Sequence, residues 1–102
     1  MSPVLSKLKQ FRDLRKQAKA YKNAIGDEVF VGASSDDLVK ITIDGTQKMT
    51  GVSIDPSLLT AESKEKLEKD LLKASEDAQK QLQAEMLRKV KSGELTLPGN
   101  QG

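Results

Sequence analysis

The apolar residues of this chain change their spacing twice, and these changes constrain the fold more than any other feature of the sequence. In the first quarter they recur along one heptad-like stripe, which consists of Val4, Phe11, Leu14, Ala18, Tyr21 and Ile25. This spacing predicts a helix with a narrow apolar stripe, as in coiled coils. Ser2 suits the N-cap, Pro3 suits the first turn and Gly26 ends the helix, so we expect it to run from about residue 3 to about residue 24.

The middle of the chain alternates polar and apolar residues, which is the period of a strand that buries one face. Three strands are predicted, over residues 28–33, 38–43 and 49–54. The pair Asp44-Gly45 predicts a hairpin between the second and third strands, because glycine supplies the positive φ that such a turn needs. Pro56 ends the sheet, since proline has no N–H to donate to a strand ladder.

The last third returns to helical spacing, with apolar residues three or four apart at Leu67, Leu71, Ala74, Ala78, Leu82, Met86 and Val90. Thr60 or Ser63 is the expected cap, and the helix should end at about Lys91. The predicted order is helix, three-stranded antiparallel meander, long helix, which is the α+β class. We expect one domain over residues 1–92 and a flexible C-terminal tail over residues 93–102.

The predicted core is small for an independent domain. The chain has 102 residues with only three aromatic side chains, and its mean hydropathy is negative. Two helices of over twenty residues would overhang so short a sheet, and their apolar stripes need a partner. We therefore expect an intertwined or sheet-associated homodimer with projecting helices. The spacing leaves open whether the stripe of the first helix packs within one subunit or between two.

Charge is divided unevenly along the chain. Residues 1–25 carry seven cations and one anion, a net charge of +6, whereas residues 26–102 carry ten cations and fourteen anions, a net charge of −4. Such asymmetry between segments indicates the kind of partner rather than the fold. A strongly cationic N-terminal helix is typical of a segment that binds a polyanion.

Four cations of the first helix are spaced by three or four residues and therefore share one face, away from the apolar stripe. We call this set the basic row, and it consists of Lys9, Arg12, Lys16 and Lys19. Arg15 and Lys22 flank it, and Asp13 is the only nearby acid. Like charges at this spacing repel and lower the stability of the helix. Binding to a phosphate backbone explains such a row better than a role in solubility does, although the solubility interpretation stays open.

A smaller cluster of cations ends the second helix, at Arg88, Lys89 and Lys91. Cations are favoured at a helix C-terminus by the helix dipole, so this cluster has a structural explanation as well as a nucleic-acid one. We include the three residues among the candidate DNA contacts.

Catalysis has little support in the sequence. The chain has neither cysteine nor histidine, which excludes thiol chemistry and removes the commonest general base and metal ligand. Asp36, Asp37, Asp44 and Asp55 occupy predicted turns, where aspartate is favoured for local reasons. We expect no enzyme activity, metal, cofactor or small-molecule substrate. No membrane span or signal peptide is evident, so we expect a soluble, cytoplasmic protein without a membrane partner.

Three segments of the sequence carry a family resemblance. Residues 38–45 read Leu-Val-Lys-Ile-Thr-Ile-Asp-Gly, residues 52–59 read Val-Ser-Ile-Asp-Pro-Ser-Leu-Leu, and the likeness continues through residues 66–74. This signature resembles the YbaB/EbfC family of bacterial nucleoid-associated proteins, over roughly residues 5–92. In that family the first helix is rich in Met and Gln, whereas here it is rich in Lys and Arg.

The resemblance implies a cytoplasmic, nucleoid-associated homodimer that binds duplex DNA, with associated sheets and projecting helices. It places the DNA contacts on the helices, which transfers here to the basic row, to its flanking cations and to the cluster at Arg88, Lys89 and Lys91. We predict binding mainly through phosphates, with low sequence specificity. The alternative is an adaptor that grips acidic or amphipathic protein segments. RNA is a third possible ligand, against which the scarcity of aromatic stacking residues counts.

Overall fold

The computed structural model describes residues 3–95 of the chain, with side chains from residue 7 onward. Its elements, in order, are α1 (Pro3–Tyr21), the π-helical turn η1 (Lys22–Gly26), β1 (Val29–Ala33), β2 (Val39–Asp44), β3 (Met49–Ile54), the 3-10 turns η2 (Pro56–Leu58) and η3 (Ala61–Ser63), and α2 (Lys64–Lys91). The α+β class and the predicted order are confirmed. The predicted tail lies outside the described residues from residue 96 onward.

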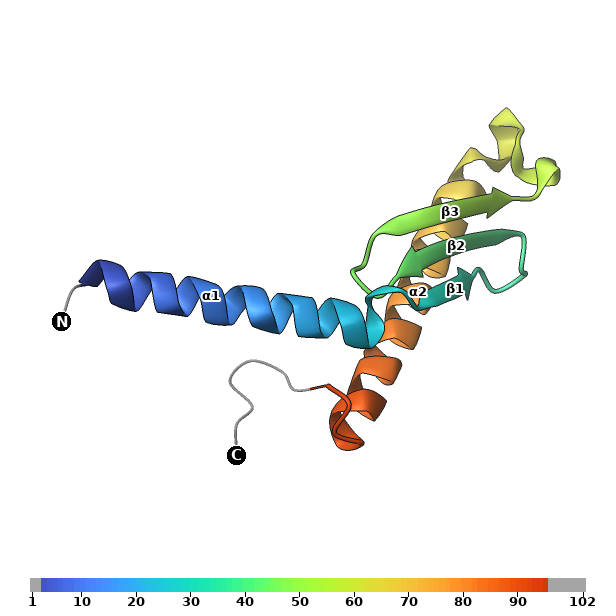
Figure 1. Ribbon diagram of the computed structural model, residues 1–102. Coiled ribbons are helices and arrows are strands. Elements are labelled where there is room, and N and C mark those ends of the chain that lie inside the picture. The colour runs from blue at the N-terminus through green and yellow to red at the C-terminus, as the bar shows by residue number, and fades with distance from the viewer. Residues whose placement is uncertain (1–2, 96–102) are drawn as a thin grey trace.

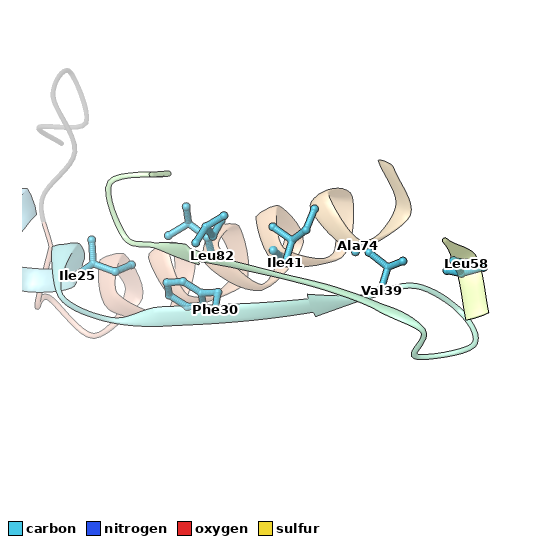
Figure 2. Close-up of a cluster of buried hydrophobic side chains, with 9 residues drawn as sticks. Ile25, Phe30, Val39, Ile41, Leu58, Ala74 and Leu82 are labelled. Atoms are coloured by element: carbon cyan, nitrogen blue, oxygen red, sulfur yellow. The ribbon is translucent and has the colours of Figure 1, made fainter. Parts of the chain in front are cut away.

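The core forms between α2 and one face of a three-stranded antiparallel sheet of order β1-β2-β3 (Figure 1). Val39, Ile41 and Ile43 of β2 all point to this face and are buried, which confirms the predicted alternation. Figure 2 shows Val39 and Ile41 along α2, whose core residues include Ala74 and Leu82. The core is therefore centred on β2 and one stripe of α2, and Ile25, Phe30 and Leu58 extend it from η1, β1 and η2.

Small residues let α2 lie close to β1. A Cβ added at Gly32 would be only 2.1 Å from the carbonyl oxygen of Ala74 and 2.8 Å from the Cβ of Ala78. Glycine on the strand and alanine on the helix are therefore required by the approach of the two backbones.

The hairpin between β2 and β3 forms, but the predicted reason for its glycine is wrong. Gly45 does not have a positive φ, and the residue of this loop that does is Gln47, at 69°. Asp44 organises the loop instead, because its carboxylate accepts hydrogen bonds from the amides of Thr46 at 2.8 Å and Lys48 at 3.0 Å. Gly45 is required for a contact with η1, which is described below.

β3 and its neighbourhood are less buried than the alternating pattern predicts. Val52 pairs with Ile41 and so faces the same side of the sheet as α2, yet it remains exposed. The reason is that α2 packs mainly on β1 and β2 and leaves most of β3 uncovered.

α1 extends away from the body of the protein as an arm attached at one end (Figure 1). The middle of its apolar stripe does not pack on its own sheet, since Phe11, Leu14 and Ala18 are exposed, and only Tyr21 and Ile25 at the end of the stripe reach the core. The radius of gyration is 18.8 Å, whereas a compact domain of this length has a value of about 13 Å. The α-helix ends at Tyr21, earlier than predicted, and continues as η1.

The end of α2 folds back on itself. The amides of Glu94 and Leu95 donate to the carbonyl oxygen of Lys89, at 2.9 and 3.1 Å, and Gly93 adopts the positive φ of 82° that this reversal needs. Leu95 is buried as a result.

Candidate nucleic-acid interface

The basic row lies on the projecting arm, and all four of its side chains are exposed. The ion pairs found among residues 7–95 involve Lys64, Lys66, Arg88 and Lys89, and none involves a cation of α1. Lys22, at the start of η1, is also exposed. The arm therefore presents its positive charge to solvent without compensation from the described part of the chain.

Arg15 is set apart from the basic row. Its guanidinium carbon lies 5.9 Å from the centroid of the Phe11 ring, one helical turn earlier. An exposed cation–π contact of this kind is worth about 0.5–1 kcal/mol. Arg15 thus lies beside the apolar stripe, and its charge borders the exposed Phe11 ring.

The cluster at the end of α2 differs from the basic row because acids surround it. Arg88 donates through Nε to Glu85 at 2.7 Å, and this hydrogen bond is the main cause that lowers the pKa of Glu85. Arg88 also pairs with Glu94 at 3.5 Å. Its charge is therefore largely balanced within the chain.

Lys89 is the most enclosed cation of the cluster. Its side chain is only 10% exposed, and its ammonium lies 3.5 Å from Glu28 and 3.9 Å from Glu85. Lys91, in contrast, is exposed and takes part in no ion pair within residues 7–95. In Figure 1 the end of α2 and the arm point in different directions from their junction. Within one chain, the cluster and the basic row therefore do not form one continuous basic surface.

The aspartates of the turns have local partners. Asp55 accepts from the amide of Ser57 at 2.9 Å, and Asp36 accepts from the Ser34 hydroxyl at 2.8 Å. Within the described residues, no group of three or more acidic side chains is placed to hold a metal ion. The helices of that part also include none that is long and apolar enough to cross a membrane.

Sequence reasoning missed a groove between α2 and the uncovered side of β3. It has a volume of about 490 Å³, and its lining is mostly apolar: Ile41, Met49, Val52, Glu68, Leu71, Leu72 and Ser75. Leu72 lies outside the predicted stripe of α2, and its position directly after Leu71 was the only signal in the sequence that the apolar face is wider there.

Comparisons with known proteins agree with this fold. The model of the YbaB/EbfC DNA-binding family matches residues 1–95. A nucleoid-associated protein of Rhodopseudomonas palustris (strain HaA2) is 36% identical, covering 100% of this chain and 98% of its own length. A nucleoid-associated protein of Brucella anthropi is 33% identical, covering 96% of this chain and 92% of its own. The crystal structure of an uncharacterized protein from Helicobacter pylori has a TM-score of 0.61 at 23% identity, over 82% of this chain and 95% of that one.

Proposed function

This chain is a member of the YbaB/EbfC DNA-binding family, and we propose that it binds duplex DNA as a homodimer, mainly through phosphates and with low sequence specificity. The proposal rests chiefly on the basic row, whose four cations are exposed on a projecting helix and unpaired within the described residues. Their mutual repulsion costs helix stability, and DNA phosphates relieve it.

Low specificity is supported by the chemistry of the row. Three of its members are lysines, which act as point charges toward phosphates, and only Arg12 has the planar fork that reads a guanine edge. Arg15, the other arginine of the arm, is stacked on Phe11. We propose the basic row, Lys22 and Lys91 as DNA contacts, and we leave out Lys89 because its charge is enclosed and paired.

The homodimer is supported by the two unequal edges of the sheet. At the β1 edge, α2 side chains satisfy two backbone groups: the amide of Ala33 donates to Asp77 at 3.0 Å, and the Gln81 side chain donates to the carbonyl of Val31 at 2.8 Å. Among the described residues, no α2 side chain bonds β3 in this way. The β3 edge is therefore the less protected of the two and the better site for another chain.

The groove beside β3 supports the same conclusion. Met49, Val52 and Leu72 are 52%, 52% and 69% exposed there, and the groove reaches Ile41 of the core. Burying one such side chain fully contributes about 1.5–3 kcal/mol. We propose that a second copy covers the groove with its own groove, around a two-fold axis.

The DNA proposal is tested with two variants of equal charge change. One replaces the basic row (K9Q, R12Q, K16Q, K19Q), and the control replaces four exposed lysines of α2 (K64Q, K69Q, K73Q, K80Q). In a fluorescence anisotropy titration with random duplex DNA at low salt, we expect the first variant to lose at least about two orders of magnitude in affinity, because electrostatic contacts supply nearly all non-specific binding. We expect the control to bind nearly as the parent does. Equal losses in both variants would show that affinity depends on net charge alone, and this would contradict the assignment of the basic row as the DNA contact.

The dimer is tested by sedimentation of Leu72→Asp beside the control Leu87→Asp. Both leucines are exposed on α2, but only Leu72 lines the groove. We expect L72D to sediment as a folded monomer and L87D as a dimer. A parent chain that is monomeric at micromolar concentration would contradict the homodimer.

A second candidate function is favoured by the bare apolar stripe of the arm. Phe11 and Leu14 are 59% and 62% exposed, and phosphate binding does not use them. An adaptor would grip a partner helix with an apolar stripe flanked by acids. Capture of one acidic protein that survives nuclease treatment and is lost in Leu14→Asp would support it.

If DNA is the ligand, we expect a fluorescent fusion of the chain to coincide with the nucleoid.

A further inference from the structure

The arm touches the rest of the protein only near its C-terminal end. Apart from the partial burial of Tyr21, the side chains of α1 from residue 7 onward are exposed, and the helix continues directly into η1 (Figure 1). A helix attached at one end takes its direction from the few contacts made there. The junction between arm and body therefore decides where the basic row lies.

Tyr21 connects three elements at this junction. Its hydroxyl donates to the carbonyl oxygen of Gly45 at 2.8 Å and lies 3.5 Å from the sulfur of Met86. Gly45 belongs to the β2–β3 hairpin, and Met86 belongs to α2. One side chain of the arm thus contacts both the sheet, through its hairpin, and α2.

Gly45 closes the junction from the side of the hairpin. A Cβ at this position would lie 1.9 Å from the carbonyl oxygen of Ile25, so no side chain fits. The amide of Gly45 donates to the carbonyl of Gly26 at 3.3 Å, and Ile25 is itself fully buried. The hairpin backbone is therefore in direct contact with η1, and this contact restricts the direction of the arm.

Lys89 pairs with the segment that directly follows the junction. Its ammonium lies 3.5 Å from Glu28, two residues after η1. This contact gives the enclosed lysine a structural role at the junction. The π-helical turn between Tyr21 and Glu28 is a conformation that proteins use mostly as a single turn, frequently at functional sites.

We propose that Tyr21, Gly45 and Lys89 form a fixed joint that sets the direction of α1, and that Tyr21 is a positioning residue for the DNA interface. The second half of this proposal rests on the proposed function. Lys9 lies twelve residues before Tyr21, which is about 18 Å along a helix. A tilt of about 20° at the joint would move it by about 6 Å, and a charge-assisted hydrogen bond of about 2.8 Å cannot follow such a displacement.

The joint is tested without DNA by electron–electron distance measurement. The chain has no cysteine, so Gln10→Cys on α1 and Gln83→Cys on α2 give two unique, exposed sites for spin labels. Labelled chains are diluted with unlabelled ones so that pairs within one chain dominate. We expect a narrow distance distribution in the parent and a broad one in Tyr21→Phe, which loses only the hydroxyl.

The matched control is Ser34→Ala, which also loses one hydroxyl. Ser34 donates to Asp36 and accepts from the amide of Val39 at 3.1 Å, far from the joint. We expect a narrow distribution in this variant. Gly45→Ala is a second test of the joint, because its Cβ forces η1 away from the hairpin and should shift the mean distance.

DNA titration of the same variants tests the positioning role. We expect Y21F to bind random duplex about 3- to 10-fold more weakly, because only a fraction of its arms hold the direction that binds DNA, and we expect an unchanged salt slope because the chains that do bind make the same phosphate contacts. S34A should bind as the parent does. A narrow distribution in Y21F would overturn the joint, and a broad one with unchanged affinity would overturn the positioning role. Failure of the parent to bind DNA would overturn the proposed function and the positioning role together, while the distance measurement would still decide the joint.

Discussion

Asp36 joins the β1–β2 loop to α2 through a single carboxylate. It forms an ion pair with Lys66, and it accepts hydrogen bonds from the Ser34 hydroxyl at 2.8 Å and the Leu38 amide at 3.2 Å. These contacts, the one with Lys66 first, lower the pKa of Asp36 from 3.8 to about 2. Lys66 also pairs with Asp70 at 2.8 Å, so the loop is held by a small network.

The folded state should therefore depend on pH through Asp36. Because its pKa is lower in the folded than in the unfolded chain, its contribution to stability is complete above about pH 4 and is lost as the pH falls toward about 2. In urea unfolding, we expect Asp36→Asn to be less stable than the parent at pH 6, and we expect the difference to be much smaller at pH 2, where about half of the folded chains still carry the charge. A difference that does not change with pH would contradict the ionic role of this carboxylate.

Two glycines of the sheet provide a matched pair of substitutions. Gly32→Ala places a methyl group 2.1 Å from the Ala74 carbonyl oxygen, so β1 and α2 must separate, and we expect a loss of about 1–3 kcal/mol or more. Gly51→Ala meets only Thr42, at an ordinary 3.6 Å, and should leave stability nearly unchanged. Thermal unfolding of both variants checks this, and equal losses would mean that strand propensity rather than helix approach requires Gly32.

At the scale of elements, the arm and α2 contrast most. α2 buries Ala74, Ala78 and Leu82 in the core, whereas the described side chains of α1 before Tyr21 are all exposed. An isolated helix of 19 residues is only marginally stable in water, and the basic row destabilises it further.

We therefore expect the amides of α1 to exchange with deuterium much faster than those at the centre of α2. Added salt should slow the exchange in α1, because it screens repulsion within the basic row, and should leave the centre of α2 unchanged. The neutral-row variant (K9Q, R12Q, K16Q, K19Q) should show slow exchange without salt. Exchange in α1 as slow as in α2 would show that its apolar stripe is covered in solution.

Most elements could be predicted from the sequence. The bounds of β3 agree with the prediction, and β2 and the end of α2 differ from it by at most one residue. Of the two expected caps, Ser63 occupies the N-cap of α2 without a side-chain hydrogen bond, and Thr60 caps η3 by accepting from the amide of Ser63 at 3.2 Å. The burial of β3 could not be predicted, because the alternation of its side chains does not say whether a helix reaches that part of the sheet.

At the scale of the whole molecule, the number of arms on one duplex should determine the salt dependence of binding. A slope of about −0.9 per neutralised phosphate gives about −4 for one basic row and about −7 for two. If the parent is the proposed homodimer, we expect it to show the steeper slope in a plot of log affinity against log salt concentration. The variant L72D, which we expect to be monomeric, should show the shallower one, and a parent slope near −4 would mean that two arms do not share one duplex.

The candidate site was only partly predictable. The basic row needed nothing beyond helical spacing, and its residues are exposed as expected. The cluster at the end of α2 looked similar in the sequence, but Lys89 pairs with Glu85, which is four positions earlier, and with Glu28, which is 61 positions earlier. Charge counted along the chain could not reveal the contact with Glu28.

The spacing of neighbouring residues is enough to specify the elements, their order, the core stripe of β2 and the one-sided charge of the arm. Tertiary structure alone decided that the arm stands free, that β3 stays uncovered, that Lys89 is enclosed and that Gly45 serves the junction rather than its turn. Each of these depends on contacts between residues that are far apart in the sequence, such as those of Tyr21 with Gly45 and Met86. Such contacts are determined by the packing of whole elements, which cannot be derived from the spacing of neighbouring residues.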